Sequence, residues 1–82
     1  MTGQDILNLI ENLIQIEEDD FIPKNVRLKL KQAISALSED GVEPRMKANK
    51  ALQELDDISN DPNVPSYIRP QIWNVVSLLE SL

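Results

Sequence analysis

Residues 20–37 read DFIPKNVRLKLKQAISAL, and residues 62–79 follow the same pattern as PNVPSYIRPQIWNVVSLL. The offset is 42 residues, from Pro23 to Pro65. Apolar residues fall on apolar residues at the spacing of three and four that one helix face requires. The matched apolar pairs are Ile22/Val64, Val26/Ile68, Leu30/Ile72, Ala33/Val75 and Ile34/Val76. Within the same stretch, Arg27 falls on Arg69. We interpret the pattern as a helix–turn–helix unit that occurs once in each half of the chain.

Hydrophobic periodicity predicts four helices and no strand, because no segment alternates apolar and polar residues with a period of two. The expected helices span residues 3–18, 23–39, 44–59 and 66–81. Pro23 and Pro44 stand at two of these starts, where proline suits the first helical turn. The two repeated units then occupy residues 1–40 and 43–82, within one domain covering residues 1–82. We predict an all-α four-helix bundle built from two similar antiparallel helical hairpins.

Three residues near the helix ends carry specific expectations. Thr2 is the expected N-cap of the first helix, and Gly41 is the expected C′ residue of the second. Pro70 lacks the N–H that a helix starting at residue 66 would need. Either the first turn of the fourth helix is distorted, or the regular helix starts nearer Arg69.

The expected core is formed by the apolar stripe of each helix. In the first helix, Leu7 and Ile14 widen this stripe on one side. The residues assigned to the four stripes are Ile6, Leu7, Leu9, Ile10, Leu13, Ile14 and Ile16, then Val26, Leu30, Ala33, Ile34 and Leu37, then Ala48, Ala51, Leu52, Leu55 and Ile58, then Ile68, Ile72, Val75, Val76 and Leu79.

Composition excludes several classes of function. The 82 residues include no histidine and no cysteine, which removes the commonest general base, thiolate chemistry and cysteine-based metal sites. The acidic run at residues 17–20 lacks the spacing and the glycine of a calcium loop. We expect no metal, no cofactor and no enzymatic activity. Neither a signal peptide nor a membrane span is indicated, so a cytoplasmic location is expected.

The net charge of −6 is unevenly distributed along the chain. Residues 1–20 hold six acidic and no basic residues, while residues 21–50 hold seven basic and three acidic ones. Lys24, Arg27 and Lys31 form a stripe along the second helix. This stripe is either a small basic face for an acidic partner or nucleic acid, or it faces the acidic first helix or solvent. Nucleic acid is the less favoured partner because the domain as a whole is acidic.

Trp73 and Tyr67 form the candidate surface for binding a protein, with Leu28 or Met46 as possible neighbours. Trp73 corresponds to Lys31 in the repeat and lies off the inner face of its helix. Tryptophan and tyrosine are typical anchors of protein interfaces. The alternative is that Trp73 covers the rim of a thin core.

Four polar residues recur at the same repeat positions: Asp19 with Asp61, and Arg27 with Arg69. The structural interpretation is that each aspartate caps the following helix or pairs with an arginine. The functional interpretation is a duplicated site for charged ligands.

Residues 55–80, LDDISNDPNVPSYIRPQIWNVVSLLE, resemble the uncharacterised protein family 0147, a group of small archaeal helical proteins. The family pattern is a D-x-I-S-N-D-P-N-x-P core, followed by an arginine and an Ile-Trp pair. It is filled here by Asp56, Ile58, Ser59, Asn60, Asp61, Pro62, Asn63, Pro65, Arg69, Ile72 and Trp73. Residues 20–37 look like the first half of the family. The resemblance implies a compact four-helix protein and supplies no catalytic or binding residues.

The two-helix unit is also similar, more weakly, to HEAT-like helical hairpins. Together these observations leave the biological role unknown. They favour a non-enzymatic protein–protein interaction module that binds an unidentified protein or a second copy of itself. The alternative is a nucleic-acid or ribonucleoprotein accessory that uses the basic stripe of the second helix.

Overall fold

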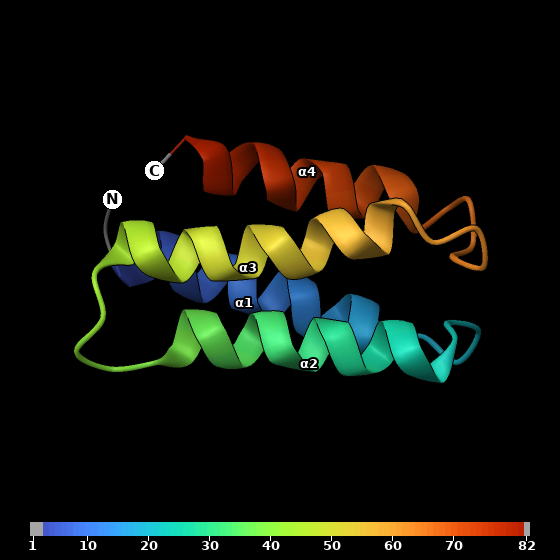
Figure 1. Ribbon diagram of the computed structural model, residues 1–82, viewed down its shortest axis with the longest axis horizontal. Coiled ribbons are helices and arrows are strands. Elements are labelled where there is room, and N and C mark those ends of the chain that lie inside the picture. Colours follow the sequence, from blue (N-terminus) through green and yellow to red (C-terminus); the bar gives the residue numbers. More distant parts are fainter. Residues whose placement is uncertain (1–2, 82) are drawn as a thin grey trace.

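The computed structural model describes residues 3–81 of the chain. It contains four helices, α1 (Gly3–Glu17), α2 (Lys24–Ser38), α3 (Pro44–Ser59) and α4 (Arg69–Glu80), and no strand within the described residues. Neighbouring helices run antiparallel along one long axis, and the α1–α2 and α3–α4 turns lie at the same end of the molecule (Figure 1). The predicted all-α four-helix fold is confirmed. The expected N-cap at Thr2 lies outside the described residues.

The helices form a ring in which each packs on the next and α4 closes onto α1. One hydrophobic cluster fills the centre, because every helix turns one apolar stripe inward. Its buried members are Leu9, Leu13, Ile16, Ile22, Val26, Leu30, Ala33, Leu37, Ala48, Ala51, Leu55, Ile58, Val64, Ile68, Ile72, Val75 and Leu79. The predicted widening of the first stripe is wrong, since Leu7 and Ile14 are exposed. They lie about 100° to 120° around the helix from Leu13, beyond the reach of the core.

Packing around the ring is uneven, with α2 and α3 in the most extensive contact and α1 and α4 in the least. The core alanines of the described residues all belong to the close pair: Ala33 in α2, and Ala48 and Ala51 in α3. At the matching repeat positions, α4 carries Val75 and α1 carries Ile6 and Leu9. Larger side chains hold two helices farther apart, so the difference in residue size accounts for the asymmetry.

Helix α2 is shorter at both ends than predicted. Pro23 is its extended N-cap rather than its first helical residue, and the helix ends at Ser38 with Glu39 as C-cap. The assignment of Gly41 as the C′ residue is therefore wrong. Gly41 lies two residues beyond the C-cap and has a φ of +75°. This left-handed conformation, which favours glycine, turns the chain toward α3.

Helix α4 begins at Arg69, three residues later than the predicted start at residue 66. Before it, the chain makes a tight turn in which the N–H of Ile68 donates to the carbonyl of Pro65 at 3.0 Å. Pro70 then occupies the first turn of the helix, where a backbone N–H has no intrahelical partner and its loss costs little. The later start is the second of the two ways of accommodating Pro70 that the sequence allowed.

Candidate interaction surface

In each hairpin, one arginine forms hydrogen bonds with the backbone at the turn between the two helices. Arg27 of α2 donates from Nε to the carbonyl of Glu17 at 3.1 Å and from Nη2 to the carbonyl of Asp19 at 2.8 Å. Arg69 of α4 donates to the carbonyls of Ser59 and Asp61 at 2.9 and 3.0 Å. Each guanidinium therefore donates to two carbonyls at the point where the preceding helix ends.

The two aspartates at these turns also make matching contacts. Asp19 accepts the backbone N–H of Phe21 at 2.8 Å, and Asp61 accepts that of Asn63 at 2.8 Å. Both are side-chain turns that reverse the backbone two residues on. The expectation that they cap a helix or pair with arginine is wrong, because the arginines bond backbone carbonyls instead.

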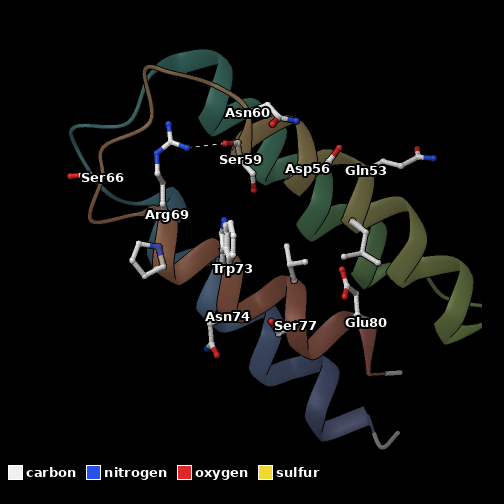
Figure 2. A pocket seen from close by; sticks show the side chains of 13 residues that line it. Gln53, Asp56, Ser59, Asn60, Ser66, Arg69, Trp73, Asn74, Ser77 and Glu80 are labelled. Carbon is white, nitrogen blue, oxygen red and sulfur yellow. Dashed lines mark hydrogen bonds between the residues drawn. The ribbon is translucent and has the colours of Figure 1, made fainter.

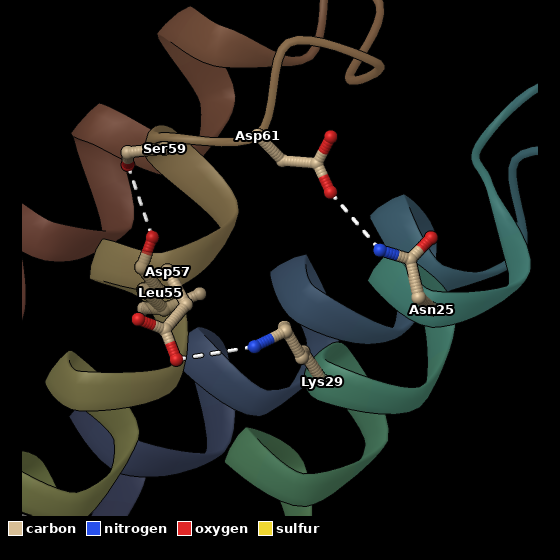
Figure 3. Close-up of polar contacts among 6 residues, drawn as sticks. All are labelled: Asn25, Lys29, Leu55, Asp57, Ser59 and Asp61. Carbon is tan, nitrogen blue, oxygen red and sulfur yellow. Dashed lines mark hydrogen bonds and ion pairs between the residues drawn. The ribbon is translucent and has the colours of Figure 1, made fainter.

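The same aspartates link the two hairpins reciprocally. Asn25 of α2 donates to Oδ2 of Asp61 at 3.0 Å, which Figure 3 shows between α2 and the end of α3. Tyr67, which occupies the matching repeat position, donates its hydroxyl to Asp19 at 2.9 Å. Loss of water around the phenol, followed by the hydrogen bond and negative charge of Asp19, raises the pKa of Tyr67 above 10.0. Tyr67 thus joins the turns of the two hairpins.

The basic stripe on α2 does not form one free surface. Arg27 is half-buried and engaged with two carbonyls, and Lys31 lies 3.6 Å from the carboxylate of Glu17. Lys24 remains as an exposed cation on this side. Lys29 points to the other side of α2 and pairs with Asp57 of α3 at 3.1 Å (Figure 3). Arg27 and Lys31, but not Lys24, therefore contact the acidic end of α1 and the turn that follows it.

An open groove of about 1280 Å³ runs between α3 and α4. Trp73 is 68% exposed, and Figure 2 shows its side chain pointing from α4 toward the end of α3 that carries Ser59. The groove is lined by Leu52, Gln53, Asp56, Ser59, Asn60, Ser66, Arg69, Pro70, Trp73, Asn74, Val76, Ser77 and Glu80. Tyr67 is not among them, and its hydroxyl is directed to Asp19 of the first hairpin.

The matching seam between α1 and α2 has different chemistry. There, Lys31 reaches across to Glu17 and makes an ion pair over the seam. At the same repeat positions the second hairpin carries Trp73 and Ser59, so no ion pair spans the α3–α4 groove at this point. Sequence reasoning noted the exchange of Lys31 for Trp73 but missed the accompanying exchange of Glu17 for Ser59. Considering both together would have indicated an open groove.

The described residues contain neither a metal-binding cluster nor a membrane-spanning helix. Within residues 3–81 there is no group of three or more acidic side chains placed to hold a metal ion. Over the same span, no helix combines the length and apolar character needed to cross a membrane.

Comparison with known proteins agrees with this fold. A family model described as "Uncharacterised protein family (UPF0147)" matches residues 2–82. The chain belongs to this family. A UPF0147 protein of Saccharolobus islandicus is 43% identical over 70 residues, covering 85% of this chain and 79% of the relative. A UPF0147 protein of Methanocaldococcus jannaschii is 39% identical over 80 residues, covering 96% of this chain and 86% of the relative.

A solved structure extends the comparison to three dimensions. The crystal structure of the unknown-function protein MMP1188 superposes with a TM-score of 0.94 and is 38% identical, covering 100% of this chain and 93% of that one. The resemblance to UPF0147 stated from residues 55–80 is therefore confirmed. Neither the family description nor these relatives' names give an activity, and the function of the chain is unknown.

Proposed function

We propose that this UPF0147 member is a non-enzymatic, cytoplasmic protein-interaction module whose docking surface is the α3–α4 groove. The observation that carries the proposal is the position of Trp73, largely exposed within a groove between two packed helices. Tryptophan buries roughly 150–250 Å² when covered and is enriched among the residues that dominate interface energetics.

The surroundings of Trp73 support the same conclusion. Leu52 and Val76 are partly buried against the core and give the groove an apolar component. The side chains of Ser59 and Ser77 are small and leave space beside the indole ring. An apolar centre with a polar rim is the usual anatomy of a protein-binding surface.

A site-specific cross-linking experiment tests the proposal. A photoreactive residue replaces Asn74 on α4, and a matched variant carries it at Gln32, the corresponding repeat position on α2. After irradiation in the native cell, proteins joined to each variant are identified by mass spectrometry and purified for binding assays. We expect one defined partner from position 74, and its loss when Trp73→Lys is added.

Two results would contradict the proposal. One is that positions 74 and 32 yield the same set of proteins, which would indicate random collision rather than a docking surface. The other is that Trp73→Lys leaves binding of the purified partner unchanged.

A further inference from the structure

The α3–α4 groove is lined by two carboxylates that form no ion pair with any of the described residues. Asp56 from α3 and Glu80 from α4 both line it, and the one cation among its lining residues is Arg69. The guanidinium of Arg69 is engaged with two backbone carbonyls. Residues 51–82, which supply all the lining residues, contain five acidic residues and one basic residue.

In the first hairpin, the acidic charge between the two helices is neutralised by a cation of the hairpin itself. Lys31 on α2 supplies a cation that reaches Glu17 on α1. The second hairpin has Trp73 at the position of Lys31, and no lysine from α3 or α4 lines the groove. A partner bound at this groove therefore meets an exposed indole flanked by carboxylates, and complementarity requires the cation to come from the partner.

The backbone N–H and C=O groups of the partner must also find hydrogen-bond partners. An extended peptide binds well where a sheet edge offers free N–H and C=O groups, and residues 3–81 contain no strand. A helix satisfies its own backbone and can lie along a groove between two helices. The part of α4 that lines the groove, residues 69–80, is about 18 Å long at 1.5 Å per residue. A helical segment of about 10–14 residues spans such a groove.

Building on the proposed function, we infer that the groove binds a basic amphipathic helix of another protein. Its apolar face covers Trp73, and flanking lysine or arginine residues meet Asp56 and Glu80. An arginine placed over the indole would add a cation–π contact. A symmetric dimer of this chain is disfavoured, because it would bring each groove face to face with its copy and place these carboxylates against one another.

The single tryptophan of the chain reports directly on the groove, so intrinsic fluorescence measures binding there. The probes are three synthetic 14-residue peptides without aromatic residues. The first places leucines on one helical face and lysines beside them. The second replaces each lysine by glutamate, and the third keeps the lysines but replaces each leucine by serine. We expect a saturable blue shift of Trp73 emission with the first peptide alone, weakening as salt is raised.

Variants of the full chain separate local from general electrostatics. Asp56→Asn with Glu80→Gln should weaken binding of the leucine–lysine peptide about fivefold or more. The matched control, Glu18→Gln with Asp20→Asn, changes the net charge equally in the exposed α1–α2 turn and should weaken binding less than about twofold.

Several outcomes would overturn the inference. These are no saturable shift with the leucine–lysine peptide, equal binding of the glutamate peptide, or equal weakening by the two double variants. A dimer in analytical ultracentrifugation that Trp73→Lys abolishes would identify a second copy as the occupant instead. If cross-linking at position 74 still yields a partner that depends on Trp73, the proposed function stands. Only the inference that this partner presents a basic helix is then rejected.

Discussion

At the scale of the residue, Trp73 combines a core-type side chain with a surface position. Its neighbours on the inner side of α4, Ile72 and Val75, are each 1% exposed, whereas Trp73 is 68% exposed. Helical geometry explains the contrast, because Trp73 lies about 160° around the helix from Val75. The indole therefore contributes little to the core and remains available to a partner.

The variant Trp73→Lys should change the free energy of unfolding by no more than about 0.5 kcal/mol, as for most exposed positions. It places at residue 73 the side chain that its repeat partner Lys31 already carries. Urea unfolding followed by far-UV circular dichroism measures the effect. A loss of several kcal/mol would mean that Trp73 is a core residue, and the groove proposal would fail.

Tyr67 provides a prediction about alkaline pH. Its pKa is raised in the folded state, so the unfolded chain releases this proton at lower pH than the folded chain does. The stability it contributes is therefore fully present below pH 10.0, the ordinary value, and is lost as pH rises through the higher folded pKa. As the only tyrosine, it can be followed by phenolate absorbance. Asp19→Asn should lower the measured pKa; an unchanged titration would mean that the contact with Asp19 is not made in solution.

At the scale of the element, each hairpin depends on one arginine that bonds the end of the preceding helix. Arg27 reaches the carbonyls of Glu17 and Asp19, and Arg69 reaches those of Ser59 and Asp61. The bonded residues match at the repeat offset of 42, from 17 to 59 and from 19 to 61. A planar guanidinium can donate to two carbonyls at once, which explains why arginine rather than lysine stands at both positions.

The variant Arg27→Ala should destabilise the protein by about 1–3 kcal/mol, because two carbonyls lose their donor in a half-buried turn. Lys24→Ala, one turn earlier on the same helix, is the control and should lie within about 0.5 kcal/mol of the parent. Both values come from chemical denaturation. Equal effects of the two substitutions would show that the hydrogen bonds of Arg27 do not stabilise the hairpin and that Arg27 behaves like an ordinary surface cation.

At the scale of the whole molecule, the repeat is broken by the packing of the helices. The closely packed helices α2 and α3 carry core alanines where α4 and α1 carry larger residues at the matching repeat positions. Substitution of Ala51 by leucine, the residue at its repeat partner Leu9, should destabilise the protein by about 1–3 kcal/mol through overpacking. Asn49→Leu on the exposed face of α3 controls for the added bulk and should be nearly neutral. A neutral Ala51→Leu would contradict the close packing of α2 on α3.

Much of the fold follows from local pattern. Helix α3 begins at Pro44 and ends at Ser59 as predicted, because its start is marked by proline and its end by the turn residues that follow. The start of α4 could not be chosen from the pattern alone, since two ways of accommodating Pro70 had similar local cost. The exposure of Leu7 and Ile14 also escaped prediction, because periodicity gives the direction of a stripe but not the width that its neighbours cover.

The candidate surface was predicted in part. The comparison of Trp73 with Lys31 indicated an outward tryptophan, but Tyr67, with which it was grouped, does not line the groove. Tyr67 donates to Asp19, a residue of the other hairpin, and a contact over 48 positions cannot be inferred from helical phase. The acidic walls of the groove, Asp56 and Glu80, were missed for the same reason, since they belong to different helices.

By itself, the sequence determined four amphipathic helices, their inward faces and the family to which the chain belongs, because each of these depends on residues near one another along the chain. Only the tertiary structure decided that Arg27 is engaged within its own hairpin, that Asp19 and Asp61 join the two hairpins, and that Trp73 stands over an open acidic groove. These features arise where separate helices meet, and their geometry depends on the size of the side chains that hold the helices apart.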